Sequence, residues 1–257
     1  MDLTDAQWRR IEPLLPKPRR RSDGRGRPWR DPRDVLNGIL WVMRTGAQWD
    51  EMPGRYPPRS TCHRRFQLWA RSGTMYRILR HLAHELAAAG GYDFSEAFID
   101  ATFAGAKKGA FAVGLTRKGK GTKIMAIADG AGVPLAVTVA SATPGEIGLV
   151  DDVLKSRFLR QLPERMIGDR GYDSDTLDAR MAKRGIEFIA PHRSTRRNIT
   201  QDGRQLRRYC RRWKIERLFA WLQNFRRLVT RYERHVENFL AFVQLACIVI
   251  LSRRFVG

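Results

Sequence analysis

The sequence predicts an α/β protein in which a mixed β-sheet, covered by helices on both faces, follows a helical region. The first 90 or so residues carry apolar side chains at helical spacing, and three short β-rich runs separated by glycine and proline follow them. The rest of the chain alternates between helix and strand before it ends in helices, which is typical of a mixed sheet. The 257 residues have room for two domains, which we place at residues 1–91 and 92–257.

Helix signals mark the N-terminal region. Thr4 and Gln7 form a capping-box pattern, and the helix that follows them ends before Pro16. A stretch of Arg, Gly and Pro without apolar periodicity comes next and predicts a basic arm over residues 17–30. Asp31 and Pro32 then begin a second helix, which Gly46 ends. Two further amphipathic helices are expected, one that begins at Ser60 and one from Met75 to Leu86.

The second half of the chain predicts the sheet and its covering helices. Runs at 94–103, 121–130 and 134–143 favour an antiparallel meander. A linker is expected at 193–204, followed by a long helix over about 206–233 and an apolar helix over about 237–252. Between the meander and the linker, the pattern predicts helices at 145–162 and 174–185 and strands at 165–169 and 186–191.

The charge is strongly positive and unevenly distributed. The formal net charge of +22 divides into +9 over residues 1–91, +1 over 92–191 and +12 over 192–257. Of the 48 basic residues 39 are arginine, which a biased genome can enrich, but such a bias would not spare the middle third. Arginine suits bidentate contact with phosphate, so the charge favours a nucleic-acid partner.

Several protein classes are disfavoured by the same sequence. The three cysteines lie far apart without CxxC pairs, which argues against a disulfide framework and a cysteine-rich zinc site. The N-terminus lacks a signal-peptide pattern. The longest apolar run, at 239–251, is interrupted by Gln244 and is shorter than a membrane span. We therefore expect a folded cytoplasmic protein with no membrane partner.

The helix that begins near Ser60 carries polar and basic residues that suit the DNA-reading helix of a helix-turn-helix. The alternative is an ordinary helical bundle with a solvated polar face, and the turn before this helix is longer than in the tight motif. The candidate DNA contacts on this helix are Arg59, His63, Arg64, Gln67 and Arg71.

Two acids stand where predicted strands end. Asp100 closes the apolar run of the first strand, and Asp169 closes the run that begins at Arg165. Open α/β sheets bind ligands at such strand ends. Oxygen ligands of this kind suit hard divalent cations, and two such cations can activate the attacking oxygen and stabilise the leaving oxygen at a phosphodiester.

A third acid, Glu216, lies on the predicted long helix. It is the only acid on a polar stripe beside the apolar stripe of that helix. Each of the three acids has an ordinary structural alternative, because strand-end aspartates cap turns and helix glutamates form surface pairs. Asp129, Asp151, Asp152 and Asp173 are competing carboxylates, and His81 with His84 suits a helix surface better than a zinc site. The polar stripe of the long helix, on which Glu216 lies, consists of Tyr209, Arg212, Glu216, Gln223 and Arg227.

Three blocks of the chain resemble insertion-sequence transposases of the DDE type, in the IS-five group (IS4/IS5-like). The segment from Tyr209 to Glu216 matches the start of that group's Tyr-x2-Arg-x3-Glu-x6-Lys signature. FIDATF around Asp100 and IGDRGYDS around Asp169 are similar to the blocks that carry its first two acids. Two further stretches, LTDAQWRRIEPLLP and that from Trp29 to Pro53, resemble its N-terminal domain, so the resemblance covers nearly the whole chain.

The resemblance implies a ribonuclease-H-like catalytic domain with Asp100, Asp169 and Glu216 as catalytic and metal-binding residues. It implies two Mg²⁺ ions, for which Mn²⁺ can substitute, and an enzyme that binds terminal inverted repeats, cleaves DNA strands and transfers them. Double-stranded DNA, at the element ends and the target, is the implied partner. A homodimer in the synaptic complex and a nucleoid-associated location in a prokaryotic cytoplasm are also implied.

One signature position departs from the family. The lysine seven residues after the glutamate is Gln223 here, so the DNA contact of that lysine passes to Arg226 or Arg227 or is weakened. Tyr209 and Arg212 would be signature residues near the DNA. Two other functions stay open on the sequence: a non-catalytic DNA-binding derivative, and a ribonuclease-H-like nuclease without strand transfer. Metal-dependent cleavage and a joined product distinguish them from a transposase.

Overall fold

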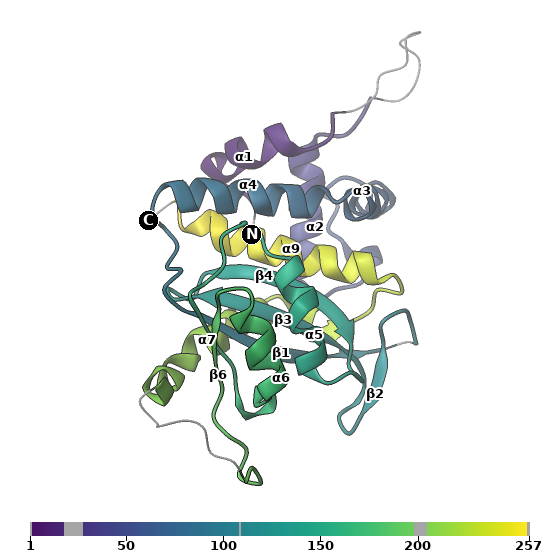
Figure 1. Cartoon of the computed structure of the whole chain (residues 1–257). Helices are drawn as coiled ribbons and strands as arrows, with labels where there is room; N and C mark the ends of the chain where they lie inside the picture. The colour runs from purple at the N-terminus through teal and green to yellow at the C-terminus, as the bar shows by residue number, and fades with distance from the viewer. Residues whose placement is uncertain (1, 18–27, 108, 198–204, 256–257) are drawn as a thin grey trace.

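The computed structural model describes residues 2–17, 28–107, 109–197 and 205–255. Most of the predicted basic arm and the second half of the predicted linker lie outside these residues. The described part has a helical layer at one side of a β-sheet, with further helices on both faces of that sheet (Figure 1).

The N-terminal helices begin and end where the sequence signals place them. The backbone N–H of Gln7 donates to the Thr4 hydroxyl (3.3 Å) and the Gln7 side chain accepts from the Thr4 N–H (3.1 Å), so the capping box is present. Asp31 accepts from the N–H of Arg33 (2.6 Å), and Gly46 ends its helix with a left-handed φ of 72°. The helices are α1 (Asp5–Ile11), α2 (Pro32–Thr45), α3 (Arg59–Arg71) and α4 (Thr74–Ala88), with 3-10 turns at Glu12–Leu14 and Trp49–Glu51.

The sheet confirms the predicted meander and its mixed character. β1 pairs antiparallel with β3, and β3 pairs antiparallel with β4. On its other side β1 pairs parallel with β5, which pairs parallel with β6. A short strand that the sequence did not predict, β2, forms a hairpin with β3. The bounds are β1 (Ala97–Ala106), β2 (Gly114–Thr116), β3 (Gly119–Asp129), β4 (Pro134–Ser141), β5 (Arg165–Ile167) and β6 (Glu187–Ile189).

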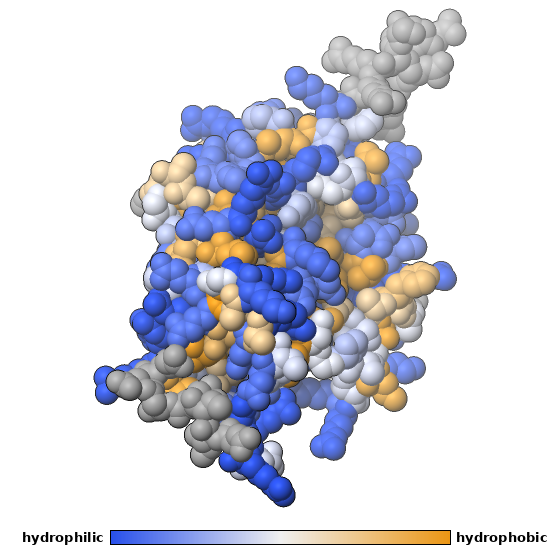
Figure 2. All heavy atoms as spheres, viewed as in Figure 1, coloured by the Kyte–Doolittle hydropathy of each residue, from blue (hydrophilic) through white to orange (hydrophobic). Residues whose placement is uncertain are grey.

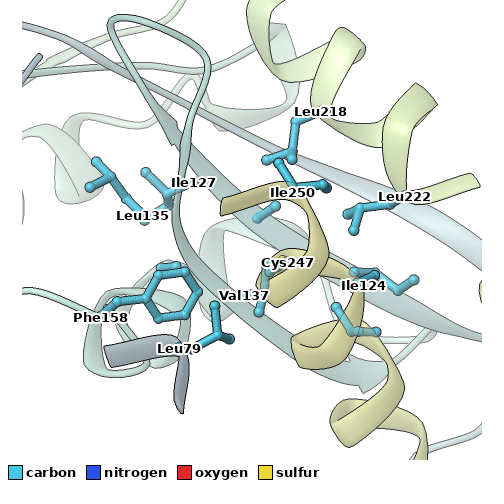
Figure 3. Packing of buried hydrophobic residues seen from close by; sticks show 14 of the residues in the cluster. Leu79, Ile124, Ile127, Leu135, Val137, Phe158, Leu218, Leu222, Cys247 and Ile250 are labelled. Atoms are coloured by element: carbon cyan, nitrogen blue, oxygen red, sulfur yellow. The ribbon is translucent and has the colours of Figure 1, made fainter. Parts of the chain in front are cut away.

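Helices cover both faces of this sheet, as predicted. Helices α5 (Glu146–Lys155) and α6 (Asp175–Ala182) lie in front of it in Figure 1, and α5 contacts β3 and β4. Helices α7 (Trp213–Gln223) and α9 (Val236–Arg253) contact each other, and they reach the sheet at β1, β3 and β4. Figure 3 shows Leu218 and Leu222 of α7 gathered with Ile250 and Cys247 of α9 around Ile124 of β3.

Helix α9 joins the N-terminal helices to the sheet. It is long and apolar enough to cross a membrane by length and composition, but most of it is buried inside the protein. It packs against α3 and α4 on one side and against β4 on the other. The same core cluster therefore includes N-terminal residues such as Leu36 and sheet residues such as Ile127.

Hydrophilic side chains cover much of the face seen in Figure 2, with smaller apolar patches between them.

The predicted long helix over 206–233 is wrong as one element. A 3-10 segment (Gln205–Arg212) precedes α7, the helix stops at Gln223, and a short α8 (Arg226–Val229) leads into β7 (Thr230–Arg231), which pairs with the end of β1. Phe225 leaves helical geometry with ψ 97° and is buried. The apolar stripe predicted along this helix consists of Ile215, Leu218, Leu222, Phe225, Val229 and Tyr232. In the structure it ends at Phe225, because Val229 and Tyr232 are 48% and 44% exposed.

A buried arginine accounts for this change of direction. Arg231 is 1% exposed and donates to the carbonyl of Phe111 (2.7 Å), the hydroxyl of Thr122 (2.6 Å) and the carbonyl of Glu233 (3.0 Å). A continuous helix would carry this guanidinium away from its acceptors, which then would be left unsatisfied in the interior.

Helix α5 is also shorter than expected, since it ends at Lys155 and not at residue 162.

Candidate functional site

The two strand acids lie on neighbouring strands. β1 and β5 pair through Ala97 with Met166 and through Phe98 with Ile167. When this pairing is continued by two residues along both segments, Asp169 comes to lie beside Asp100. Asp100 does not end its strand as predicted, because β1 continues along β3 to Ala106. It lies instead where β1 passes beyond its pairing with β5, and there the burial of β1 changes from buried to partly exposed.

Arg212 binds the first acid directly. Its Nη2 lies 2.5 Å from Asp100 Oδ2, and its Nη1 donates to the Tyr209 hydroxyl at 3.2 Å. Both charged side chains are mostly buried, at 14% and 17% exposed. Burial raises the pKa of Asp100, the Ala101 N–H and Arg212 oppose the rise, and the charges of Asp169 and Glu146 add to it. Asp100 thus lies among other carboxylates and is balanced by one arginine.

Asp169 has a local structural role as well as its place beside Asp100. Its Oδ1 accepts the N–H of Gly171 at 2.7 Å and so caps a 3-10 turn from Arg170 to Tyr172. A Cβ at Gly171 would lie 2.8 Å from that oxygen, so a side chain at this position would displace the carboxylate. The turn holds the carboxylate at the end of β5, and capping and ligand binding are compatible because a carboxylate has four lone-pair sites.

Glu216 lies on α7 between two residues that contact β1. Arg212 precedes it by one turn and reaches Asp100, and Gln223 follows it and donates to the hydroxyl of Thr102 at 3.2 Å. These residues belong to one polar stripe, so Glu216 points to the same side of the helix and is exposed. Within the described residues no group of three His, Cys, Asp or Glu side chains is close enough together to hold a metal ion.

Glu96 anchors the segment that carries Arg212 and Glu216. Its carboxylate is 2% exposed and lies 2.5 Å from Arg211, 3.1 Å from Lys214 and 3.6 Å from Arg208. Sequence reasoning missed this acid. The signal is the spacing of three in the cations at 208, 211 and 214. A 3-10 segment with three residues per turn brings the first two to one side, and Lys214 follows them in the first turn of α7.

Glu146 is a second carboxylate that the sequence analysis did not single out. It is the first residue of α5, it lies 3.5 Å from Lys123, and its charge raises the pKa of Asp100. It therefore lies close enough to the strand acids to influence them. The one signal for it in the sequence is its place at a helix start directly after the third predicted strand.

The competing carboxylates all have structural partners. Asp129 is fully buried, accepts two backbone N–H groups of the turn between β3 and β4 and that of Asp93 before β1, and has a pKa that burial raises to about 6. Of the remaining three, Asp151 pairs with Arg180 and Arg184, Asp152 with Lys155, and Asp173 with His192 and Arg196. His81, exposed on α4, lies 3.4 Å from Glu85.

The five candidates on α3 have different surroundings. Arg64 and Arg71 line a pocket with residues 28–30. His63 and Gln67 line another, of about 250 Å³, together with Arg227. Arg59 is exposed and ion-paired with Asp50. DNA contact by these five residues stays a prediction.

The three candidates at the end of α7 and just after it also differ in environment. Arg227 is buried and paired with Glu233 at 2.8 Å, so its guanidinium is committed within the protein. Arg226 is exposed and packs its Cβ against Gly46. Gln223 is exposed beside Thr102. Of these three, Gln223 is the one on the stripe that contacts β1.

Known proteins with the same features are transposases. Residues 92–251 match the model of the family described as "Transposase DDE domain", which covers more than half of the chain. Residues 3–79 match the model described as "Putative transposase of IS4/5 family". The chain belongs to the IS4/5-type DDE transposases. The resemblance that the three sequence blocks carry is thereby confirmed.

Two relatives of this transposase come from bacteria. One, from Burkholderia cepacia, is described as "Putative transposase for insertion sequence element IS402" and is 36% identical over 138 residues, or 51% of this chain and 62% of the relative. The other, from Brucella ovis, is described in the same words for element IS6501 and is 34% identical over 134 residues, or 51% of this chain and 98% of the relative. The match thus spans less than two thirds of the first relative.

A solved structure shares the fold. The piggyBac transposase in a synaptic complex with hairpin DNA aligns with a TM-score of 0.55 and 11% identity, over 91% of this chain and 68% of that one. At this identity the likeness concerns the fold alone. The predicted ribonuclease-H-like sheet with a helical N-terminal region is confirmed by it and by the strand order described above.

Proposed function

We propose that the chain binds the terminal inverted repeats of an insertion sequence, cleaves a DNA strand there and transfers it to a target. The observation that carries this proposal is the placement of Asp100 beside Asp169 on parallel strands, with Arg212 of the family signature bound to Asp100. Paired carboxylates at the end of a sheet suit phosphodiester chemistry because they are oxygen donors for hard cations.

The chemistry of these donors fits a divalent cation. Asp100 and Asp169 provide only oxygen ligands. Burial and, to a smaller degree, the charge of Asp169 raise the pKa of Asp100, and a bound cation would oppose both effects. We propose that Asp100, Asp169 and Glu216 hold two Mg²⁺ ions, with Mn²⁺ as a substitute. When bound, such ions neutralise charge at the scissile phosphate and favour the ionised form of the attacking hydroxyl.

The roles of the other residues follow from their contacts. Arg212 restrains the Asp100 carboxylate and places a guanidinium next to the cleavage site, where it can bind a phosphate oxygen. Tyr209 orients Arg212 through its hydroxyl. Gln223, held by Thr102, contributes a neutral donor where the family has a lysine, so its DNA contact is weaker in charge but retained as a hydrogen bond.

DNA binding is assigned to the two basic flanks. Charges of +9 over residues 1–91 and +12 over 192–257 lie on either side of a nearly neutral segment that carries Asp100 and Asp169. Phosphate contacts would provide affinity and a few side chains the sequence preference. We place the end-binding domain at 1–91 and the catalytic domain at 92–257, in a homodimer that acts on the nucleoid.

The test uses the DNA on either side of the coding region as donor. The full chain is incubated with end-labelled donor fragments and a supercoiled target plasmid in Mg²⁺, in Ca²⁺ and in EDTA. We expect a strand cut with a free 3′-hydroxyl and a joined product in Mg²⁺ alone. Cleavage without a joined product would indicate a nuclease, and binding without cleavage would indicate a DNA-binding derivative.

A further inference from the structure

A pocket of about 580 Å³ lies where residues 28–30 approach α3. Four arginines line it, namely Arg30, Arg64, Arg65 and Arg71, and its lining contains no carboxylate. Arg64 and Arg71 were expected to contact DNA, but Arg65 and Trp29 had no predicted role. The pocket is distant in sequence from the carboxylates of β1 and β5 and has a different chemistry.

Arg65 gives the pocket its particular character. Its side chain is 7% exposed, and its Nη1 atom is buried without a hydrogen-bond partner. Among the described residues no carboxylate pairs with it. Burial lowers the pKa of Arg65, and the neighbouring charge of Arg64 lowers it further. A buried cation without a partner destabilises the folded protein unless an anion binds beside it.

Trp29 covers the same guanidinium. The Arg65 Cζ lies 3.7 Å from the centroid of the Trp29 ring, which is a cation–π contact and fixes the plane of the guanidinium. Trp29 remains 47% exposed, and Leu68 nearby is 42% exposed. The pocket thus has a charged interior and an apolar rim, which suits a ligand that carries an anionic group on an apolar frame.

We propose that this pocket binds one backbone phosphate of duplex DNA, with Arg65 as the buried ligand of that phosphate. Arg64 and Arg71 bind its outer oxygens, and the adjoining deoxyribose packs on Trp29 and Leu68. The occupant follows from charge complementarity, because the described residues that line the pocket include four arginines and no carboxylate, and guanidinium groups match phosphate oxygens. The proposal rests on the DNA-binding part of the proposed function and is independent of its chemistry.

If Arg65 binds phosphate, its replacement affects stability and DNA binding in opposite directions, which a purely structural arginine would not do. Replacing Arg65 with methionine keeps an unbranched side chain against Trp29 but removes the unpaired charge. We expect Arg65→Met to raise the melting temperature of the free protein by about 2–5 °C. We also expect it to weaken binding to a 30-base-pair duplex about tenfold and to reduce the salt slope of that binding by about one.

Matched variants separate the pocket from general charge. Arg80→Met removes one exposed arginine of α4, and we expect less than a twofold change in duplex affinity. Arg64→Ala changes an exposed pocket residue, so we expect it to leave the fold unchanged and to weaken binding severalfold. Inorganic phosphate alone is tested as a second ligand. If the pocket binds the phosphate of DNA, 10 mM inorganic phosphate protects the protein from heat far less than the duplex does.

Four results would overturn the assignment. These are a lower melting temperature for Arg65→Met, a duplex affinity for Arg65→Met equal to that of Arg80→Met, no effect of Arg64→Ala, and protection by phosphate equal to that by duplex. Failure of the proposed chemistry is recognised separately. In that case the wild-type chain binds duplex and Arg65→Met weakens binding as stated, but no strand is cut.

Discussion

Asp100→Asn and Asp169→Asn are each expected to reduce Mg²⁺-dependent strand cleavage at least about 1000-fold while leaving duplex affinity within about twofold. Asp100 lies on β1 beside Asp169, which follows the end of β5, and both carboxylates are charged oxygen donors at this point of the sheet. Asparagine keeps the shape of the aspartate side chain but lacks the negative charge that attracts a hard cation. A 1000-fold loss of cleavage rate corresponds to about 4 kcal/mol of transition-state stabilisation. Single-turnover cleavage of the labelled donor fragment measures the loss.

Asp152→Asn is the matched control for this pair. Asp152 is 61% exposed on α5 and pairs only with Lys155 among the described residues, so we expect its cleavage rate to stay within twofold of wild type. Asp100→Asn also leaves Arg212 without its carboxylate, which strengthens rather than weakens contact with phosphate. Cleavage at more than a tenth of the wild-type rate in either variant would remove that aspartate from the site.

Glu96→Ala is expected to lower the free energy of unfolding by about 3–5 kcal/mol. The Glu96 carboxylate is buried and holds three cations, and removal of one partner from a buried ion group leaves uncompensated charge. Urea denaturation followed by circular dichroism measures the change. Glu164→Ala, which removes a carboxylate that is 68% exposed beside Arg165, is the control and is expected to cost less than about 1 kcal/mol.

Glu96→Ala is also expected to disturb the candidate active site. Arg211 and Lys214 connect Glu96 to the 3-10 segment and to α7, so loss of the anchor would displace Arg212 from Asp100. At temperatures where Glu96→Ala remains folded, we expect cleavage to fall more than duplex binding. A stability equal to that of Glu164→Ala would contradict the anchoring role.

The sequence predicted those parts of the fold that local signals determine. The capping box at Thr4, the left-handed Gly46 and the alternating runs of the meander act within a few residues, and the structure has the elements they indicate. The break at Phe225 has no such signal. It depends on Arg231, whose acceptors on the 111–112 loop and on β3 are distant in the sequence.

The candidate site was predictable to a similar degree. Asp100, Asp169 and Arg212 were each identified, because motif residues and strand ends are visible in the sequence. The pairing of Arg212 with Asp100 was not, since it requires α7 to cross β1. Glu96 and Arg65 were missed because their importance comes from burial, and a charged residue in a sequence gives no sign that it will be buried.

The placement of Glu216 with the two aspartates at one metal centre is the central claim, and localised radical cleavage tests it most directly. Fe²⁺ replaces Mg²⁺ in the full chain, ascorbate and peroxide are added, and the cut positions in the polypeptide are mapped by mass spectrometry. The account predicts cuts near residues 100, 169 and 216 that excess Mg²⁺ suppresses. Cuts near 100 and 169 but near 146 instead of 216 would contradict it and make Glu146 the third ligand.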